Sequence, residues 1–249
     1  MRRTVTECCA RVVACALLLA PASARAQRTA PITPSAAPLE RARGTSSAGY
    51  LVRPRDLSQP RPVTVYLHGI CGVPEHGCPQ FREGVSDRSW LLCPSAPVRC
   101  EGGGSAWGPR GSSNADAVRA LVAEAARLAP GGVDRARPGV LIGFSQGAYV
   151  AERMLRSAEG RGRWRGVVFI GGFIRSTRAQ LEGQGVRRVV LAAGRNDMTR
   201  ATLEETARRL QNEGFPARFV DLGAVGHTYV PARNVAGWRD ALAWLEETY

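Results

Sequence analysis

Short apolar runs alternate with longer amphipathic segments along most of this chain. The runs are rich in valine, leucine and isoleucine, and Val63–Leu67 is the clearest of them. Short runs of this kind are typical of strands buried on both faces of a sheet. The amphipathic segments place apolar residues three or four positions apart, as helices do, and residues 112–129 show this best. The alternation predicts an α/β fold with a mostly parallel sheet covered by helices on both faces.

The pattern assigns an order of elements to the chain. Strands are expected at residues 48–52, 63–67, 89–94, 138–142, 167–170, 189–193 and 217–222. Helices are expected at residues 78–87, 112–129, 148–155, 177–182, 199–213 and 234–247. Residues 97–111 are expected to form a long flexible loop at the carboxyl end of a strand, where ligands bind. The segment 171–188 is too short for a large cap domain, so we expect an open, shallow site.

A pentapeptide joins the strand at 138–142 to the following helix. Its sequence, Gly143-Phe144-Ser145-Gln146-Gly147, matches the G-x-S-x-G pattern in which a serine sits on a sharp strand-to-helix turn. Glycines are needed there because backbone packs against backbone. The pattern alone also fits an ordinary turn, so the hypothesis that Ser145 is a nucleophile needs a base and an acid elsewhere.

Two further residues follow strands in the order that such a nucleophile requires. Asp197 comes after the run 189–193, and His227 comes after the run 217–222. A histidine would accept the serine proton, and an aspartate would orient the histidine. Asp197 could instead cap a helix, His227 could be a surface histidine, and Asp221 is a rival acid. The catalytic hypothesis is Ser145, Asp197 and His227.

The strand at 63–67 runs into His68-Gly69-Ile70, a junction where serine hydrolases build half of an oxyanion hole. We assign the backbone N–H donors to Ile70, with Cys71 as a close alternative, and to Gln146. His68 is expected to hold the loop rather than to act as base. Cys71 and Trp107 are expected at the substrate, although Trp107 could equally pack on the surface.

These motifs together resemble the α/β-hydrolase superfamily, and the Gly143–Gly147 segment is similar to the phospholipase/carboxylesterase and dienelactone-hydrolase-like branch. The resemblance covers residues 44–249. It implies hydrolysis of carboxylic ester or thioester bonds through an acyl-enzyme, without metal or organic cofactor. The chain departs from the branch at Ala148, where a second glycine is usual, and at Met198-Thr199-Arg200, where a valine-proline pair is usual. These departures leave the substrate undefined.

The N-terminus is typical of an exported protein. Two arginines precede the apolar stretch 12–20, and Ala24-Arg25-Ala26 offers a small-x-small cleavage site. We therefore predict a signal peptide at 1–26, a Pro/Ala-rich linker at 27–43 and a catalytic domain at 44–249. The apolar stretch is too short to span a membrane, so the protein is expected to be secreted or periplasmic.

Four cysteines remain after residue 26. An even number in an exported chain suggests disulfides, and three pairings are possible. The preferred one joins neighbours seven positions apart, namely Cys71 with Cys78 and Cys93 with Cys100. A zinc site that combines these cysteines with His76 was the alternative, but the spacing matches no usual zinc motif. No metal is expected, and His76 is expected on an exposed loop.

The formal net charge is +13, and all 34 basic residues are arginine. The arginines are spread along the chain without a basic block or interleaved aromatic residues, so nucleic acid is not an expected partner. A weak attraction to anionic surfaces is the milder expectation.

The leading functional hypothesis is a secreted serine esterase acting on a small-molecule or polymer ester. A serine peptidase of the same fold is a second hypothesis, but such enzymes usually add a propeller or a large cap. A third is an exported domain that only binds a ligand or polymer, for which a complete triad would be unnecessary.

Overall fold

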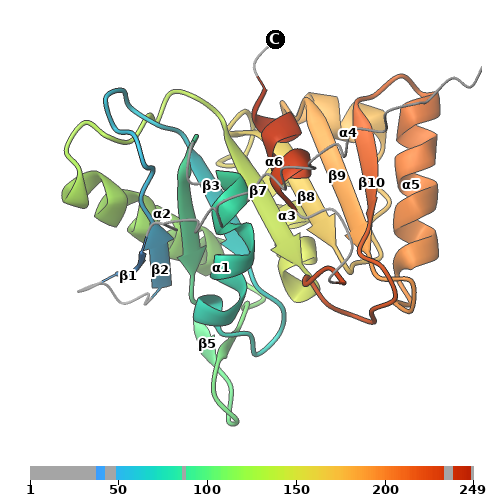
Figure 1. The fold of residues 1–249 in the computed structure, drawn as a ribbon, viewed down its shortest axis with the longest axis horizontal. Helices are drawn as coiled ribbons and strands as arrows, with labels where there is room; N and C mark the ends of the chain where they lie inside the picture. Colours follow the sequence, from blue (N-terminus) through green and yellow to red (C-terminus); the bar gives the residue numbers. More distant parts are fainter. Residues whose placement is uncertain (1–37, 43–48, 86–87, 233–237, 248–249) are drawn as a thin grey trace, which may run out of the picture. The chain divides into compact units, whose positions relative to one another are not determined.

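The computed structural model describes residues 38–42, 49–85, 88–232 and 238–247, so the predicted signal peptide lies outside the described residues. Within these residues, a sheet of eight strands has the order β1-β2-β4-β3-β7-β8-β9-β10 (Figure 1). Its strands are β1 (Leu39–Arg41), β2 (Gly49–Val52), β3 (Val63–Leu67), β4 (Trp90–Pro94), β7 (Gly139–Phe144), β8 (Trp164–Ile170), β9 (Arg188–Ala193) and β10 (Ala217–Asp221). Every pairing from β4 to β10 is parallel, and β1 and β2 are antiparallel to their neighbours. The predicted mostly parallel sheet is confirmed.

Helices cover both faces of this sheet. They are α1 (Pro74–Val85), α2 (Gly111–Leu128), α3 (Gln146–Arg156), α4 (Arg178–Gly183), α5 (Arg200–Asn212) and α6 (Trp238–Glu246). Successive residues of a strand point to opposite faces, so each strand contributes to two cores. Val65 and Leu67 of β3 pack in the core that contains residues of α2, α3, α4 and α5, whereas Tyr66 packs with α1 and α6. Figure 1 shows α1 and α6 in front of the sheet.

Most predicted helices agree with these bounds to within a few residues. α1 begins four residues earlier than predicted, at Pro74, because a proline fits the first turn of a helix. The part of the last predicted helix that precedes Trp238 lies outside the described residues. Among the described residues, no helix has both the length and the apolar character needed to cross a bilayer.

Two segments predicted to be irregular contain strands. Leu39–Arg41, inside the predicted linker, forms β1 and pairs with β2, so the linker prediction is wrong for these residues. Residues 27–37 of that linker lie outside the described residues. The predicted loop 97–111 contains a two-stranded hairpin of β5 (Val98–Arg99) and β6 (Ser105–Ala106). Both errors have one cause: these strands are too short to show an apolar alternation.

The four described cysteines form two disulfides, but not the preferred ones. Cys78 of α1 is bonded to Cys93 of β4, and Cys71 is bonded to Cys100. The preferred pairing of sequence neighbours is therefore wrong. Cys78 and Cys93 are fully buried in the same core, between α1 and the face of β4 that it covers, so the fold brings them together across 15 residues.

Candidate active site

Ser145 lies on a strained turn between β7 and α3. Its φ of 53° and ψ of −118° fall where residues other than glycine are rare. The backbone N–H of Ser145 donates to the carbonyl of Ile170 at the end of β8, over 2.8 Å. A Cβ at Gly143 would lie 2.4 Å from the Gly147 carbonyl oxygen, and one at Gly147 would lie 2.1 Å from that of Leu67. The turn therefore requires both glycines, as the sequence pattern predicts.

Ser145, His227 and Asp197 form one chain of hydrogen bonds. His227 Nε2 lies 2.9 Å from Ser145 Oγ, and His227 Nδ1 lies 2.9 Å from Asp197 Oδ2. An ionised carboxylate can only accept, so Nδ1 carries the proton and Nε2 is left to accept from the serine hydroxyl. The three side chains come from the ends of three parallel strands, β7, β9 and β10, which meet at one edge of the sheet. Below, this edge is called the carboxyl edge.

Asp197 is held by a residue that the sequence reasoning missed. Its Oδ1 accepts hydrogen bonds from both the backbone N–H and the hydroxyl of Thr199, each 2.8 Å long. Its side chain is fully buried. A threonine two positions after an aspartate is a common turn arrangement, so the spacing carried the signal. These bonds leave Oδ2 directed at His227.

The imidazole of His227 is positioned by packing and remains half-exposed. Phe144, next to the serine, lies with its ring centroid 5.0 Å from that of His227. A Cβ at Gly171 would lie 2.9 Å from His227 Cε1, so a side chain there would push the ring away. Of the His227 side chain, 46% is exposed. Asp221, the rival acid, instead pairs with Arg195 and Arg200.

Three backbone N–H groups near Ser145, two in the loop after β3 and one at the start of α3, are the donors that the sequence predicts for an oxyanion hole. In the described chain, the N–H groups of Ile70, Cys71 and Gln146 donate to no other protein group. Gly69 lies against the elbow, because a Cβ on it would be 3.3 Å from Ser145 Cβ. Donors free of protein partners beside a nucleophile can stabilise a developing oxyanion.

The same loop is fixed from two sides. Cys71 has a φ of 50°, which is uncommon for a residue with a side chain, and it is bonded to Cys100 beside the β5–β6 hairpin. The N–H of Ser105 in β6 donates to the carbonyl of Gly72 over 3.1 Å. The hairpin therefore holds the backbone that carries the Ile70 N–H.

Trp107 and His68 fix this loop by hydrogen bonds. The indole N–H of Trp107 donates to the His68 carbonyl over 2.8 Å, and its backbone exchanges hydrogen bonds with the Gln146 side-chain amide. Only 4% of Trp107 is exposed, which leaves little of its ring for a substrate. Burial lowers the pKa of the His68 imidazole, whose Nδ1 lies 2.7 Å from the Gly69 carbonyl. His68 thus holds the loop, as expected.

Apolar side chains are exposed around this edge. Ile70, Phe173, Met198 and Val230 are each more than 40% exposed, and they follow β3, β8, β9 and β10 respectively. Met198 directly follows Asp197, and Phe173 lies two positions after Gly171, which contacts His227. An exposed apolar rim at a concentration of polar groups favours ligands with apolar parts.

The predicted exposed position of His76 is observed, although it lies in α1 rather than in a loop. All four described cysteines are consumed by disulfides. Within the described ranges, no three His, Cys, Asp or Glu side chains are grouped so that they could hold a metal ion.

Comparison with known proteins yields structural likeness alone. A scan against protein-family models and a search of curated protein sequences both found no match. Solved structures do match: an esterase from Pseudomonas putida (18% identity, 85% of this chain and 82% of that chain, TM-score 0.57) and the Bacillus cereus carboxylesterase (22%, 80% and 93%, TM-score 0.53). The protein TT1662 from Thermus thermophilus also matches (25% identity, 85% and 100%, TM-score 0.51).

The esterases among these neighbours are α/β-hydrolases, and their likeness to this chain extends over most of both chains. The chain described here has the α/β-hydrolase fold.

Proposed function

We propose that this protein is a serine hydrolase of carboxylic esters and, by the same chemistry, of thioesters. The observation that carries the proposal is the continuous hydrogen-bonded chain from Ser145 through His227 to Asp197. Several structural neighbours are named esterases or carboxylesterases, which supports the same class of reaction.

The proposed reaction has two halves, acylation and deacylation of Ser145, and His227 acts first as base and then as acid in each. His227 Nε2 takes the proton of Ser145 as Oγ attacks the ester carbonyl carbon. The N–H groups of Ile70 and Gln146 donate to the carbonyl oxygen as it becomes negative. His227 then protonates the departing alcohol, which leaves an acyl group on Ser145. Water attacks that acyl group as His227 takes its proton, the bond to Ser145 Oγ breaks, His227 returns the proton to Oγ, and the carboxylic acid leaves.

The exposed apolar rim supports esters with apolar acyl or alcohol parts. The side chain of Ile70, whose N–H is the proposed oxyanion donor, is 65% exposed. The side chain of Met198, next to the proposed acid Asp197, is 80% exposed. Burial of such side chains against a hydrocarbon group would contribute about 25 cal/mol per Å² of apolar area removed from water.

Export is also proposed. Two disulfides among the described residues support an oxidising compartment, and the pattern at 1–26 is that of a signal peptide. The folded hydrolase domain would begin near β1 rather than at residue 44. N-terminal sequencing of protein recovered from the periplasm or medium should begin at Gln27, and a retained Met1 would contradict export by this route.

The test is hydrolysis of p-nitrophenyl esters of increasing acyl length by the wild type, Ser145→Ala and Ser112→Ala. Ser112 is an exposed serine of α2 and serves as the matched control. Loss of a nucleophilic serine is expected to lower kcat by on the order of 10⁴-fold or more, with no loss in the control. Labelling of Ser145 by an organophosphorus ester, followed by mass spectrometry, reports the covalent step.

Two results would redirect the proposal. Cleavage of peptides in preference to every ester would favour a peptidase. Folded wild type without turnover of any ester, and with Ser145 unlabelled, would leave a protein that binds its ligand without hydrolysing it.

A further inference from the structure

A cavity of about 690 Å³ lies at the edge of the sheet opposite Ser145. Its wall includes Val63, Gly139 and Trp164, which stand at the beginnings of β3, β7 and β8. The carboxyl edge carries the Ser145 turn at the far end of β7. The cavity lies at the other edge, where these strands begin, which we call the amino edge. It is therefore separate from the Ser145 turn, and its size is typical of small-molecule sites.

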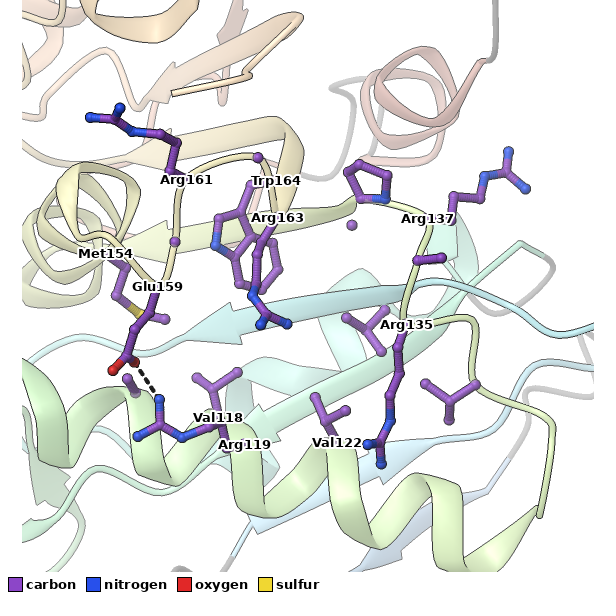
Figure 2. Close-up of a pocket in the computed structure, with 18 of the residues that line it drawn as sticks. Val118, Arg119, Val122, Arg135, Arg137, Met154, Glu159, Arg161, Arg163 and Trp164 are labelled. Carbon is purple, nitrogen blue, oxygen red and sulfur yellow. Dashed lines mark hydrogen bonds and ion pairs between the residues drawn. The ribbon is translucent and has the colours of Figure 1, made fainter. Parts of the chain in front are cut away.

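The floor of the cavity is apolar. Val118 and Val122 project into it from α2, one helical turn apart, and Met154 reaches it from α3 (Figure 2). Val63 and Val133 complete the apolar surface. Val118 is already buried, so a hydrocarbon group of medium length would remove mainly the half-buried Val63, Val122 and Val133 from water.

The rim of the cavity is cationic. Five arginines line it, and only Arg119 among them is neutralised, by ion pairs with Asp116 and Glu159. In the described chain, the other four make no ion pair; they are Arg135, Arg137, Arg161 and Arg163. In Figure 2 the guanidinium group of Arg163 lies above α2 between Val118 and Val122, and that of Arg135 lies over the same helix, beyond Val122. Those of Arg137 and Arg161 point outward.

A buried donor without a partner lies in the same wall. Trp164 is 5% exposed, and its indole N–H donates to no group of the described chain. A buried donor normally has a partner, because an unmade hydrogen bond costs about 1 to 3 kcal/mol. The nitrogen itself is closed to solvent, so it marks an incompletely bonded wall of the cavity rather than a contact for a ligand.

A half-buried arginine, Arg165, follows Trp164 in β8. The pKa of the Arg165 guanidinium is lowered, first by burial and then by repulsion from Arg137. The guanidinium plane binds carboxylate and phosphate oxygens through two parallel hydrogen bonds.

We propose that this cavity binds a small amphipathic anion, whose hydrocarbon part covers the valines of α2 and whose carboxylate or phosphate head is held by Arg135 and Arg163. The site stands apart from the proposed ester hydrolysis and does not depend on it.

Calorimetric titration of the purified protein with octanoate, octyl phosphate and 1-octanol tests this proposal. We expect one site per chain for at least one of the two anions and about tenfold weaker binding of the uncharged alcohol, a difference of about 1.4 kcal/mol. The preferred anion distinguishes a carboxylate ligand from a phosphate ligand. Equal affinity for all three compounds, or no binding of either anion, overturns the proposal.

Variants locate the binding. Arg135→Gln/Arg163→Gln should weaken binding of the anion by about tenfold, whereas Arg187→Gln/Arg208→Gln removes two exposed arginines elsewhere and should leave it unchanged. Wild-type affinity in the Arg135→Gln/Arg163→Gln variant would place the anion elsewhere, the Ser145 site included, and contradict the assignment.

Discussion

Asp197 and Glu246 are both buried carboxylates, but they lie at opposite edges of the sheet and are bonded differently. Asp197, at the carboxyl edge, accepts two hydrogen bonds from Thr199 and one from His227, so both its oxygens are used. Glu246, at the amino edge, accepts from Ser89 and Thr64 on Oε1 alone. No group of the described chain donates to its Oε2. One carboxylate is fully satisfied as an anion, and the other is not.

The contrast holds for these two carboxylates and not for every group of the two edges, because the buried Tyr66 hydroxyl of β3 also has no partner in the described chain. Both described disulfides include a residue of the carboxyl edge, Cys71 after β3 or Cys93 of β4. At the amino edge, the buried Trp164 Nε1 and Arg165 Nε have no partner in the described chain. Groups bonded to capacity hold a fixed geometry, which proton transfer requires. Groups with unused capacity can still respond to a proton or a ligand.

The largest expected effect comes from removing the charge at the satisfied carboxylate. In Asp197→Asn, the amide would donate to His227 Nδ1 and force the proton onto Nε2, which could then no longer accept from Ser145. We expect kcat for an ester substrate to fall about 10⁴-fold, with the fold retained.

The rival acid provides the control for this experiment. Asp221→Asn removes a carboxylate that pairs with Arg195 and Arg200, so its kcat should stay within a few-fold of wild type. Loss of kcat in Asp221→Asn with near-normal turnover in Asp197→Asn would exchange the two assignments.

The second effect compares the two disulfides, which should contribute similarly to stability but differently to activity. A loop of 29 residues closed by Cys71–Cys100 should contribute about 3 to 4 kcal/mol to the unfolding free energy, and the 15-residue loop of Cys78–Cys93 about 3 kcal/mol. Urea unfolding should therefore show similar losses for Cys71→Ala/Cys100→Ala and Cys78→Ala/Cys93→Ala.

Only the first pair should also lose activity at a temperature where both variants are folded, because Cys71 adjoins the proposed oxyanion donor of Ile70. Equal kcat in the two folded variants would show that the hairpin stabilises the loop without positioning it.

These cysteines also show where sequence reasoning fails. The apolar runs predicted the parallel strands, because a strand buried on both faces has a distinctive composition. Disulfide pairing depends on which elements become neighbours, and α1 meets β4 only once the sheet has formed. Spacing along the chain carries no such information. The linker prediction failed at Leu39–Arg41 for a related reason, since a three-residue edge strand is defined by its partner β2.

The site shows a similar division. Sequence alone predicts that Ser145, Asp197 and His227 lie together, because each follows a strand in an order characteristic of the fold. Supporting contacts cannot be predicted in this way, since the bonds of Trp107 to His68 and Gln146 join residues 39 positions apart. Phe144 beside His227 likewise gives no signal before the fold is known.

The third effect weakens the satisfied carboxylate without removing it. Thr199→Val keeps the shape and the backbone N–H but deletes the hydroxyl that donates to Asp197 Oδ1. We expect kcat to fall about tenfold, because a hydrogen bond to a charged group contributes about 1.5 to 3 kcal/mol and part of it is recovered by relaxation. Thr199→Ser keeps the hydroxyl and should restore kcat; equal losses in both variants would point to packing rather than positioning.

The smallest effect concerns Glu246 and appears only as a dependence on pH. Burial raises the pKa of this carboxyl in the folded protein, against the hydrogen bonds from Ser89 and Thr64 and the attraction of Arg165 and Arg88, which lower it. The folded state therefore holds the proton to a higher pH than the unfolded state, whose glutamate titrates near about 4.3. The stability that Glu246 gains by holding this proton is fully present below the unfolded pKa and is lost as pH rises through the folded pKa.

Glu246→Gln removes this titration but keeps an acceptor for Ser89. Urea unfolding from about pH 4 to about pH 8 should show wild type losing unfolding free energy relative to Glu246→Gln, while Glu205→Gln, an exposed control, follows wild type. A wild type that gains stability relative to Glu246→Gln over that range would mean that this carboxylate, too, is satisfied as an anion, and the contrast between the two carboxylates would not hold.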